Sequence, residues 1–235
     1  MTFTRKCFAL TVFFLTTTLL INAQQNESFR NQFMIGVGAG PVFTEVDFEP
    51  RIAQTFSNGL SGGVSVKYIS EKHLGVLAEL NFTQRGWQED FSTSDNPEYL
   101  YSRTLSYVEL PLLTHIYFGN KVRFILNIGP QISYMLVDKA NMNDALADYI
   151  EGVLTDNPDL PIGIQYKSID NRFDYGLVGG LGIEFNTAVG SFDLEGRYYF
   201  GLGDSFDNTR SSASNFSRSA HRYIAAKLTY YFKVL

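Results

Sequence analysis

The chain has 235 residues, of which 45% are hydrophobic, 18% are charged and 15% are aromatic. The formal net charge of −5 argues against a nucleic-acid partner, which requires a basic face. The single cysteine, Cys7, excludes a disulfide framework and a metal site built from cysteines.

Residues 1–23 have the features of a secretory signal peptide. Arg5 and Lys6 give a positive start, and the apolar run that follows ends at Ile21. This run is too short to span a bilayer comfortably as a helix, which needs about 20 residues. We therefore expect a signal peptide at 1–23 and one exported domain at 24–235, with an uncleaved N-terminal anchor as the alternative.

Eight later segments alternate apolar and polar residues with a period of two, which predicts β-strands rather than helices. The expected strands are 33–43, 60–68, 74–85, 106–118, 122–136, 173–185, 192–200 and 223–232. The central pair, 106–118 and 122–136, is about twice as long as an ordinary strand of five or six residues. Such a length suits a tilted strand that crosses a bilayer, for which roughly nine to eleven residues are needed.

The connections between these strands alternate strictly between long and short. The long ones are expected at 44–58, 86–103, 138–172 and 201–219, and the short ones at 70–73, 119–121 and 186–190. A barrel with both termini inside has short periplasmic turns and long outer loops in this order. We therefore predict an all-β, eight-stranded antiparallel up-and-down transmembrane β-barrel in the cell outer membrane.

The aromatic residues on the outward faces fall into two groups, as expected for girdles at the two membrane interfaces. The short-turn group comprises Phe33, Tyr68, Phe118, Phe124, Phe185, Phe192 and Phe232. The long-loop group comprises Phe43, Phe82, Tyr134, Phe173, Tyr175, Tyr198 and Phe200. Aliphatic residues and glycine fill the belt between them, which should contact lipid.

The inward faces carry charges of both signs in nearly equal number. These residues are Lys67, Glu79, Arg85, Glu109, Arg123, Asp174, Glu184, Asp193, Glu195, Arg197 and Lys227. An eight-stranded barrel has a lumen just wide enough for side chains, and an unpaired charge away from water is costly. We therefore expect an interior filled by ion pairs.

Two prolines lie inside expected strands, Pro111 and Pro130. Proline cannot donate to a β-ladder, and a closed barrel offers no edge strand that would tolerate it. We predict a bulge or locally missing hydrogen bonds at both positions.

Several segments resemble the PorT-like family of outer-membrane β-barrels of Bacteroidota. They are AELNFTQRGW at 78–87, YVELPLL at 107–113, NIGP at 127–130, FDYGL at 173–177 and GGLG at 179–182. The resemblance implies an eight-stranded barrel in the outer membrane. It also implies a link to type IX protein secretion, because the family's namesake is tied to that system.

Motifs for chemistry are weak in this chain. The glycine-rich segment 36–40 lacks the following helix that a nucleotide-binding loop needs, and His115 is expected to be a paired histidine of the lumen. His221 is expected at the outer rim, where a hydrolase would place its catalytic groups, near the loop residues Asp204, Ser205, Asp207 and Ser219. A triad needs mutual hydrogen-bond geometry, so we predict no enzyme, no cofactor and no metal, with a rim hydrolase as an alternative.

Residues 142–154 carry apolar side chains at helical spacing, which predicts a short amphipathic helix. This helix is either a lid packed on the barrel mouth or a surface that binds a partner. The expected function is a structural or interaction role of a monomer, performed through the outer loops. The alternatives are a component associated with type IX secretion and a small-solute channel, and the expected partners are membrane lipid and secretion-machinery or surface proteins.

Overall fold

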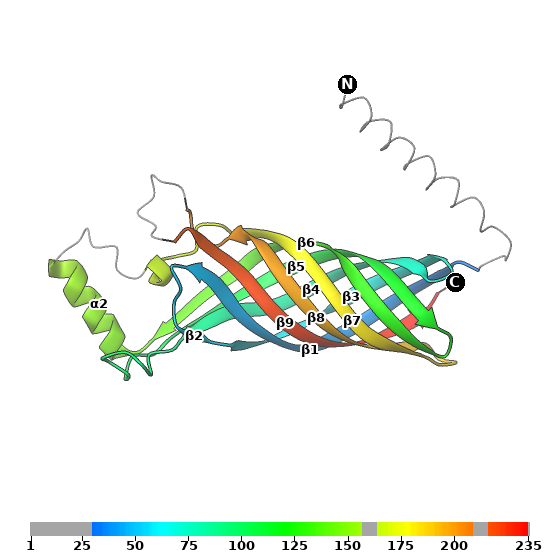
Figure 1. Ribbon diagram of the computed structural model, residues 1–235, viewed down its shortest axis with the longest axis horizontal. Helices are drawn as coiled ribbons and strands as arrows, with labels where there is room; N and C mark the ends of the chain where they lie inside the picture. Colours follow the sequence, from blue (N-terminus) through cyan, green and yellow to red (C-terminus); the bar gives the residue numbers. More distant parts are fainter. Residues whose placement is uncertain (1–29, 157–163, 209–215, 235) are drawn as a thin grey trace, which may run out of the picture. The chain divides into compact units, whose positions relative to one another are not determined.

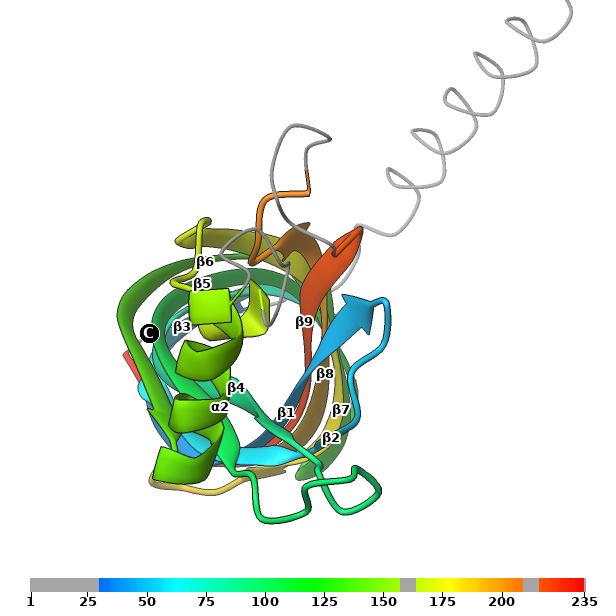
Figure 2. The same ribbon diagram turned by 90° about the vertical axis from the view of Figure 1, so that its left-hand side faces the viewer.

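The computed structural model describes residues 30–156, 164–208 and 216–234, so the expected signal peptide at 1–23, the anchor alternative and Cys7 lie outside the described residues. Asn31–Leu235 is one of the chain's two compact units. In this unit, eight long strands close into a barrel (Figures 1 and 2). Among the described residues, no helix is long and apolar enough to cross a membrane.

The eight strands follow one another around the ring in chain order, and every neighbouring pair is antiparallel. They are β1 Gln32–Glu49, β3 Ser57–Glu71, β4 Leu74–Glu89, β5 Tyr101–Gly119, β6 Val122–Met142, β7 Phe173–Asn186, β8 Ser191–Asp204 and β9 Arg218–Lys233. Pairing of β1 with β9 and of β4 with β5 closes the ring. The predicted eight-stranded up-and-down barrel is confirmed.

Three short elements lie at the long-loop end of the barrel. Strand β2, Gln54–Thr55, pairs with the end of β4. Helix α2, Asp144–Asp156, and the 3-10 helix η1, Ile164–Tyr166, both belong to the connection between β6 and β7. The predicted amphipathic helix is therefore present, two residues further along the chain than expected.

Side chains alternate between an exposed outer face and a buried interior along the ring strands. On β5, Leu110 and Leu112 are exposed, whereas Glu109 and Leu113 are buried. The exposed set is apolar through the middle of each strand, because the surface that meets acyl chains must be apolar. The strand faces expected from the period of two are thus the observed faces.

Both prolines interrupt the β-ladder without changing its register. The β4–β5 pairing skips Leu110 and Pro111, and the β5–β6 pairing skips Gly129 and Pro130. The register is the same on either side of each gap, so the ladder is locally broken and no bulge forms at either proline. The register shift of β5 lies at Ser106 instead.

The strands extend further past the outer girdle than the sequence predicts. β1 continues to Glu49, so the loop expected at 44–58 is mostly strand, and the loop expected at 86–103 shortens to the residues between β4 and β5. β6 and β8 likewise continue into their expected loops. The outer connections still remain longer than the short turns, so the predicted alternation of long and short connections holds.

These extensions follow an inverted pattern of polarity. At the end of β1, the outward residues Glu45 and Asp47 are charged, with Glu45 half-buried and Asp47 exposed, whereas the inward residues Val46 and Phe48 are buried. Above the membrane the wall meets water, so its outer face becomes polar and its inner face becomes an apolar core. The loop prediction was wrong here because it extrapolated the lipid-facing pattern, which ends where the lipid ends.

Candidate functional site: the filled lumen and the outer cap

The structure places all eleven charged residues named for the lumen inside the barrel, and each makes at least one ion pair. Five cations face six carboxylates along the barrel axis. Even the most exposed of these side chains, that of Arg123, is only 11% exposed. The charges form three successive groups between the short turns and the outer loops.

The group nearest the short turns is centred on Lys67. Its ammonium lies 2.6 Å from carboxylate oxygens of both Glu184 and Asp193, and 3.8 Å above the ring of Tyr231. Arg123 bonds the other oxygen of Glu184 at 2.7 Å. Partners from β3, β6, β7 and β8 therefore meet across the lumen.

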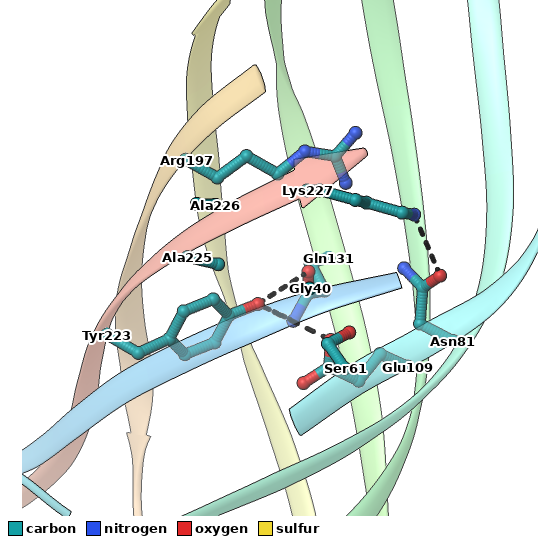
Figure 3. Close-up of a pocket in the computed structure, with 10 residues that line it drawn as sticks. All are labelled: Gly40, Ser61, Asn81, Glu109, Gln131, Arg197, Tyr223, Ala225, Ala226 and Lys227. Carbon is teal, nitrogen blue, oxygen red and sulfur yellow. Dashed lines mark hydrogen bonds between the residues drawn. The ribbon is translucent and has the colours of Figure 1, made fainter. Parts of the chain in front are cut away.

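The middle group is centred on Glu79. This carboxylate accepts bonds from Arg197 at 2.6 Å and Lys227 at 2.8 Å, and Arg197 also pairs with Glu195 at 2.8 Å. Asn81 links Glu79 to Lys227 by donating to the first and accepting from the second. Figure 3 shows Lys227 and Arg197 reaching across the interior from β9 and β8.

The outer group is centred on Arg85. Its guanidinium donates to Glu109, to Asp174 at 2.6 Å and to Ser133 at 3.0 Å. The rings of Tyr107, Tyr199 and Tyr223 surround it, with centroids 4.6, 4.6 and 5.0 Å away. Hydrogen bonds and stacking together satisfy a fully buried cation.

The space between the middle and outer groups is small. A pocket between the middle and outer groups, drawn in Figure 3, has a volume of about 10 Å³. That is roughly the space of one water molecule. Paired side chains therefore fill the lumen at this level, as expected for an eight-stranded barrel.

The predicted girdle residues lie on the outer face at the two ends of the belt. Strand pairing brings Phe118 opposite Phe124 and Phe185 opposite Phe192 at the short-turn end, and Tyr134 opposite Phe173 at the other end. Phe33 is half-buried, and the other girdle residues are exposed, namely Phe43, Tyr68, Phe82, Phe118, Phe124, Tyr134, Phe173, Tyr175, Phe185, Phe192, Tyr198, Phe200 and Phe232.

The two histidines singled out in the sequence are both buried. His115 bonds Asn127 through Nδ1 at 2.7 Å and stacks on Tyr117. His221 places Nε2 3.3 Å from both Tyr107 Oη and Ser205 Oγ. Its Nδ1 has no hydrogen-bond partner among the described residues, whereas a catalytic triad needs an acid at that nitrogen.

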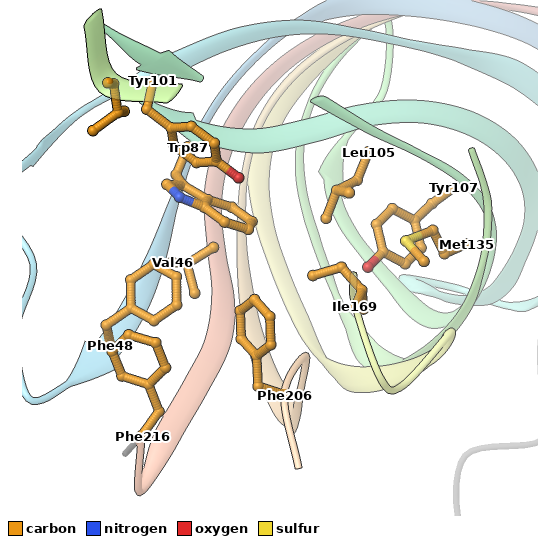
Figure 4. Close-up of a cluster of buried hydrophobic side chains, with 11 residues drawn as sticks. Val46, Phe48, Trp87, Tyr101, Leu105, Tyr107, Met135, Ile169, Phe206 and Phe216 are labelled. Carbon is orange, nitrogen blue, oxygen red and sulfur yellow. The ribbon is translucent and has the colours of Figure 1, made fainter. Parts of the chain in front are cut away.

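A second, apolar layer lies above the charged lumen, and we call it the outer cap (Figure 4). It consists of the buried side chains Val46, Phe48, Trp87, Tyr101, Leu105, Tyr107, Met135, Leu146, Ile169, Phe206 and Phe216. Phe48 packs edge-on to Trp87 at 5.4 Å and against Phe216 at 4.7 Å. Leu146 of α2 belongs to this layer, so the helix is anchored on the barrel mouth.

The sequence interpretation missed the outer cap because it assigned Trp87 to a loop. Trp87 is instead a fully buried residue of β4, and Arg103 lies 5.5 Å from its ring. Arg103 pairs with Asp138 of β6 at 2.5 Å. The missed signal was the inverted alternation of residues 45–49, which marks a strand with an apolar interior.

Glu89 is a buried acid at the edge of the outer cap, beyond the outer girdle. Tyr166 donates to its Oε2 at 2.9 Å, and its Oε1 has no hydrogen-bond partner among the described residues. Burial raises the pKa of Glu89 above its ordinary value of 4.5, and the side chains of Tyr166 and Gln165 oppose this shift. The cap therefore holds one acid whose charged form is disfavoured.

Solved structures with a similar trace are small outer-membrane barrels. The Ail protein of Yersinia pestis aligns over 87% of this chain and 100% of its own, with 12% identity and a TM-score of 0.41. OprG of Pseudomonas aeruginosa aligns over 86% and 93%, with 10% identity and a TM-score of 0.45. The outer-membrane enzyme PagL aligns over 84% and 99%, with 9% identity and a TM-score of 0.36.

No curated protein matches the chain at a significant level. One protein-family profile does match, and it is described as "Outer membrane protein beta-barrel domain". The match covers residues 22–207, which include seven of the eight ring strands and the whole connection that carries α2. With its closed ring and apolar outer belt, the chain belongs to this family of outer-membrane β-barrel proteins.

Proposed function

We propose that this protein is a closed scaffold in the outer membrane, and that it acts by presenting its outer loops to other molecules. The proposal rests on one observation, that side chains fill the barrel at two levels. Three groups of ion pairs occupy the lumen, and the apolar outer cap lies above them. A barrel filled in this way supports a structural or interaction role better than the alternative of a small-solute channel.

The proposal includes a monomeric state and no enzymatic activity. The closed ring leaves no long strand edge to pair with a second copy. Ser205, Ser219 and His221 are 4%, 1% and 1% exposed, so the serines expected near His221 are shielded from substrate, as is the histidine. The expected partners are lipid around the belt and secretion-machinery or surface proteins at the loops.

The test is to capture neighbours in native outer membranes by cross-linking. The wild type is compared with a variant in which the connection between β6 and β7 is replaced by a short polar linker. We expect specific neighbours to be lost from the variant while its barrel remains folded. Recovery of an identical set from both proteins would contradict an interaction role of this connection.

An association with type IX secretion is the second candidate, and the PorT-like segments are what favours it. These segments lie in β4, β5, β6 and β7, where they supply the lumen residues Glu79, Arg85, Glu109 and Asp174. They therefore describe the barrel rather than its outer loops. Deleting the gene and measuring export of type IX cargo separates the two candidates, since unchanged export removes the secretion role.

A further inference from the structure

A pocket of about 240 Å³ lies outside the lumen, at the outer end of the molecule. Three segments form it, namely the connection between β4 and β5, helix α2 and the 3-10 helix η1. Its walls include the rings of Phe91, Tyr99, Tyr149 and Tyr166. This volume lies below the roughly 300–1,000 Å³ of typical ligand pockets, so it suits a group of about one ring.

Packing and hydrogen bonds hold these rings in place. Tyr99 packs against Tyr149 of α2 at 5.6 Å and receives the edge of Phe91 at 5.9 Å. Tyr166 is fixed on its far side by the bond to Glu89 and by an edge contact of 4.6 Å with Tyr101. These contacts fix the walls of the pocket relative to one another.

The lining is neutral and keeps spare hydrogen-bonding capacity. Among the residues that the structure describes, the polar ones in the wall are Ser94, Asn96 and Gln165, and none of the lining side chains is charged. The side-chain amide of Asn96 and the hydroxyls of Tyr99 and Tyr149 have no hydrogen-bond partner among the described residues. Tyrosine with serine and asparagine is also the side-chain mixture that adaptable recognition loops use.

We propose that this pocket binds one neutral hexopyranose unit of a surface glycan. A pyranose ring has a C–H face that packs on aromatic rings, and its hydroxyls need neutral donors and acceptors around the edge. A phosphate or sulfate group would lack a counter-charge here, and an acyl chain would leave the amide and hydroxyls unused. The inference rests on the proposed interaction function and names a ligand class for its outer loops.

The test uses the protein in phosphatidylcholine nanodiscs, because alkyl-glycoside detergents would themselves present sugars. The probes are the methyl pyranosides of glucose, mannose and N-acetylglucosamine, observed by saturation-transfer NMR. We expect transfer to the ring protons of at least one probe. Tyr149→Ala and Asn96→Ala should each weaken binding of that probe by roughly fivefold, as loss of a ring contact or a buried polar contact does.

Tyr134→Ala is the matched control, because this exposed tyrosine belongs to the outer girdle and not to the pocket. It should leave the transfer unchanged, and gel mobility before and after heating confirms that each variant is folded. Absence of transfer to all three sugars overturns the inference, as does transfer that both pocket variants leave unchanged. Cyclohexanol, a ring of the same size with a single hydroxyl, is a further probe, and transfer to it alone also overturns the inference and assigns the pocket to a mainly apolar group.

The cross-linking experiment distinguishes failure of the sugar inference from failure of the proposed interaction function. If the connection that carries α2 captures neighbours while the sugars do not bind, the sugar inference fails and the interaction role stands. If sugar binding is lost in Tyr149→Ala and no neighbour depends on the connection, the pocket stands as a sugar site and the broader partner role fails.

Discussion

Arg85 is buried at the centre of the outer charge group, where Glu109 and Asp174 both depend on it for compensation. Arg85→Ala would leave two buried carboxylates without their cation. Removing one partner of a buried ion pair costs about 3–5 kcal/mol, so we expect a loss of this size in the free energy of unfolding. Urea titration of the protein refolded in lipid vesicles measures it.

Arg123→Ala is the control for this prediction. Arg123 is slightly exposed, and its partner Glu184 keeps a second cation, Lys67. The loss should therefore be nearer the roughly 1.5–3 kcal/mol of a single hydrogen bond to a charged group. Equal losses in the free energy of unfolding would mean that the contacts of Arg85 stabilise the barrel no more than the single ion pair of Arg123.

The outer cap should respond to pH through Glu89. The pKa of Glu89 is raised in the folded state, so ionising this carboxyl destabilises the cap. The loss of stability is absent below pH 4.5, the ordinary pKa, because the carboxyl is then protonated in both the folded and the unfolded state. The loss grows as the pH rises through the folded-state pKa. Glu89→Gln should therefore slow hydrogen exchange in the cap at neutral pH and have little effect below pH 4.5. Faster exchange in the variant at neutral pH would contradict this account.

The seam between the first and last strands depends on Gly40 of β1. A Cβ at this position would lie 1.7 Å from the backbone oxygen of Ala226 on β9. Gly40→Ala must therefore push the two strands apart, and overpacking of this kind typically costs about 1–3 kcal/mol. The midpoint of urea unfolding measures the cost, and an unchanged midpoint would show that the seam tolerates a methyl group.

Gly62→Ala on the neighbouring strand β3 is the matched control. Its Cβ would meet the nearest atoms at 3.5 and 3.6 Å, which are ordinary contacts. The expected change is within about 0.5 kcal/mol, as for most surface substitutions. A drop as large as that of Gly40→Ala would mean that both variants report a general effect of glycine replacement rather than the seam.

The strands could be predicted from the sequence wherever they contact lipid, because lipid imposes an apolar outer face. This is why the alternation through Leu110 and Leu112 gave the correct faces for β5. The same rule failed at residues 44–49, where water replaces lipid and Val46 and Phe48 turn inward. It also placed Trp87 in a loop, although Trp87 is a buried residue of β4, because polar residues alternating with an inward apolar one were taken for a loop.

At the scale of the whole molecule, the depth of a residue in the membrane should set the cost of a charge on the outer face. Leu112 lies at mid-belt on β5 and is 49% exposed. Leu112→Arg should cost about 2–4 kcal/mol, whereas Leu136→Arg, just past the outer girdle residue Tyr134, should cost about 0–1 kcal/mol. Refolding titrations compare the two variants, and equal costs would contradict the assigned depth of the belt.

Closure of the ring also explains why the charged residues could be named from the sequence but not paired. Lys67 bonds Glu184 and Asp193, which are 117 and 126 positions away in the chain. Inward direction follows from the period of two, whereas the choice of partner depends on the order, tilt and register of all eight strands. Likewise, the pocket beside α2 needs three distant segments to meet, so the sequence gives no sign of it.

Conductance of the purified protein in a planar lipid bilayer tests the central claim, that the lumen is filled, most directly. We expect the wild type to show no single-channel steps, because the charge groups around Lys67, Glu79 and Arg85 occupy successive levels of the barrel and the outer cap covers them. Regular ohmic steps from folded wild-type protein would contradict this account and favour the solute channel.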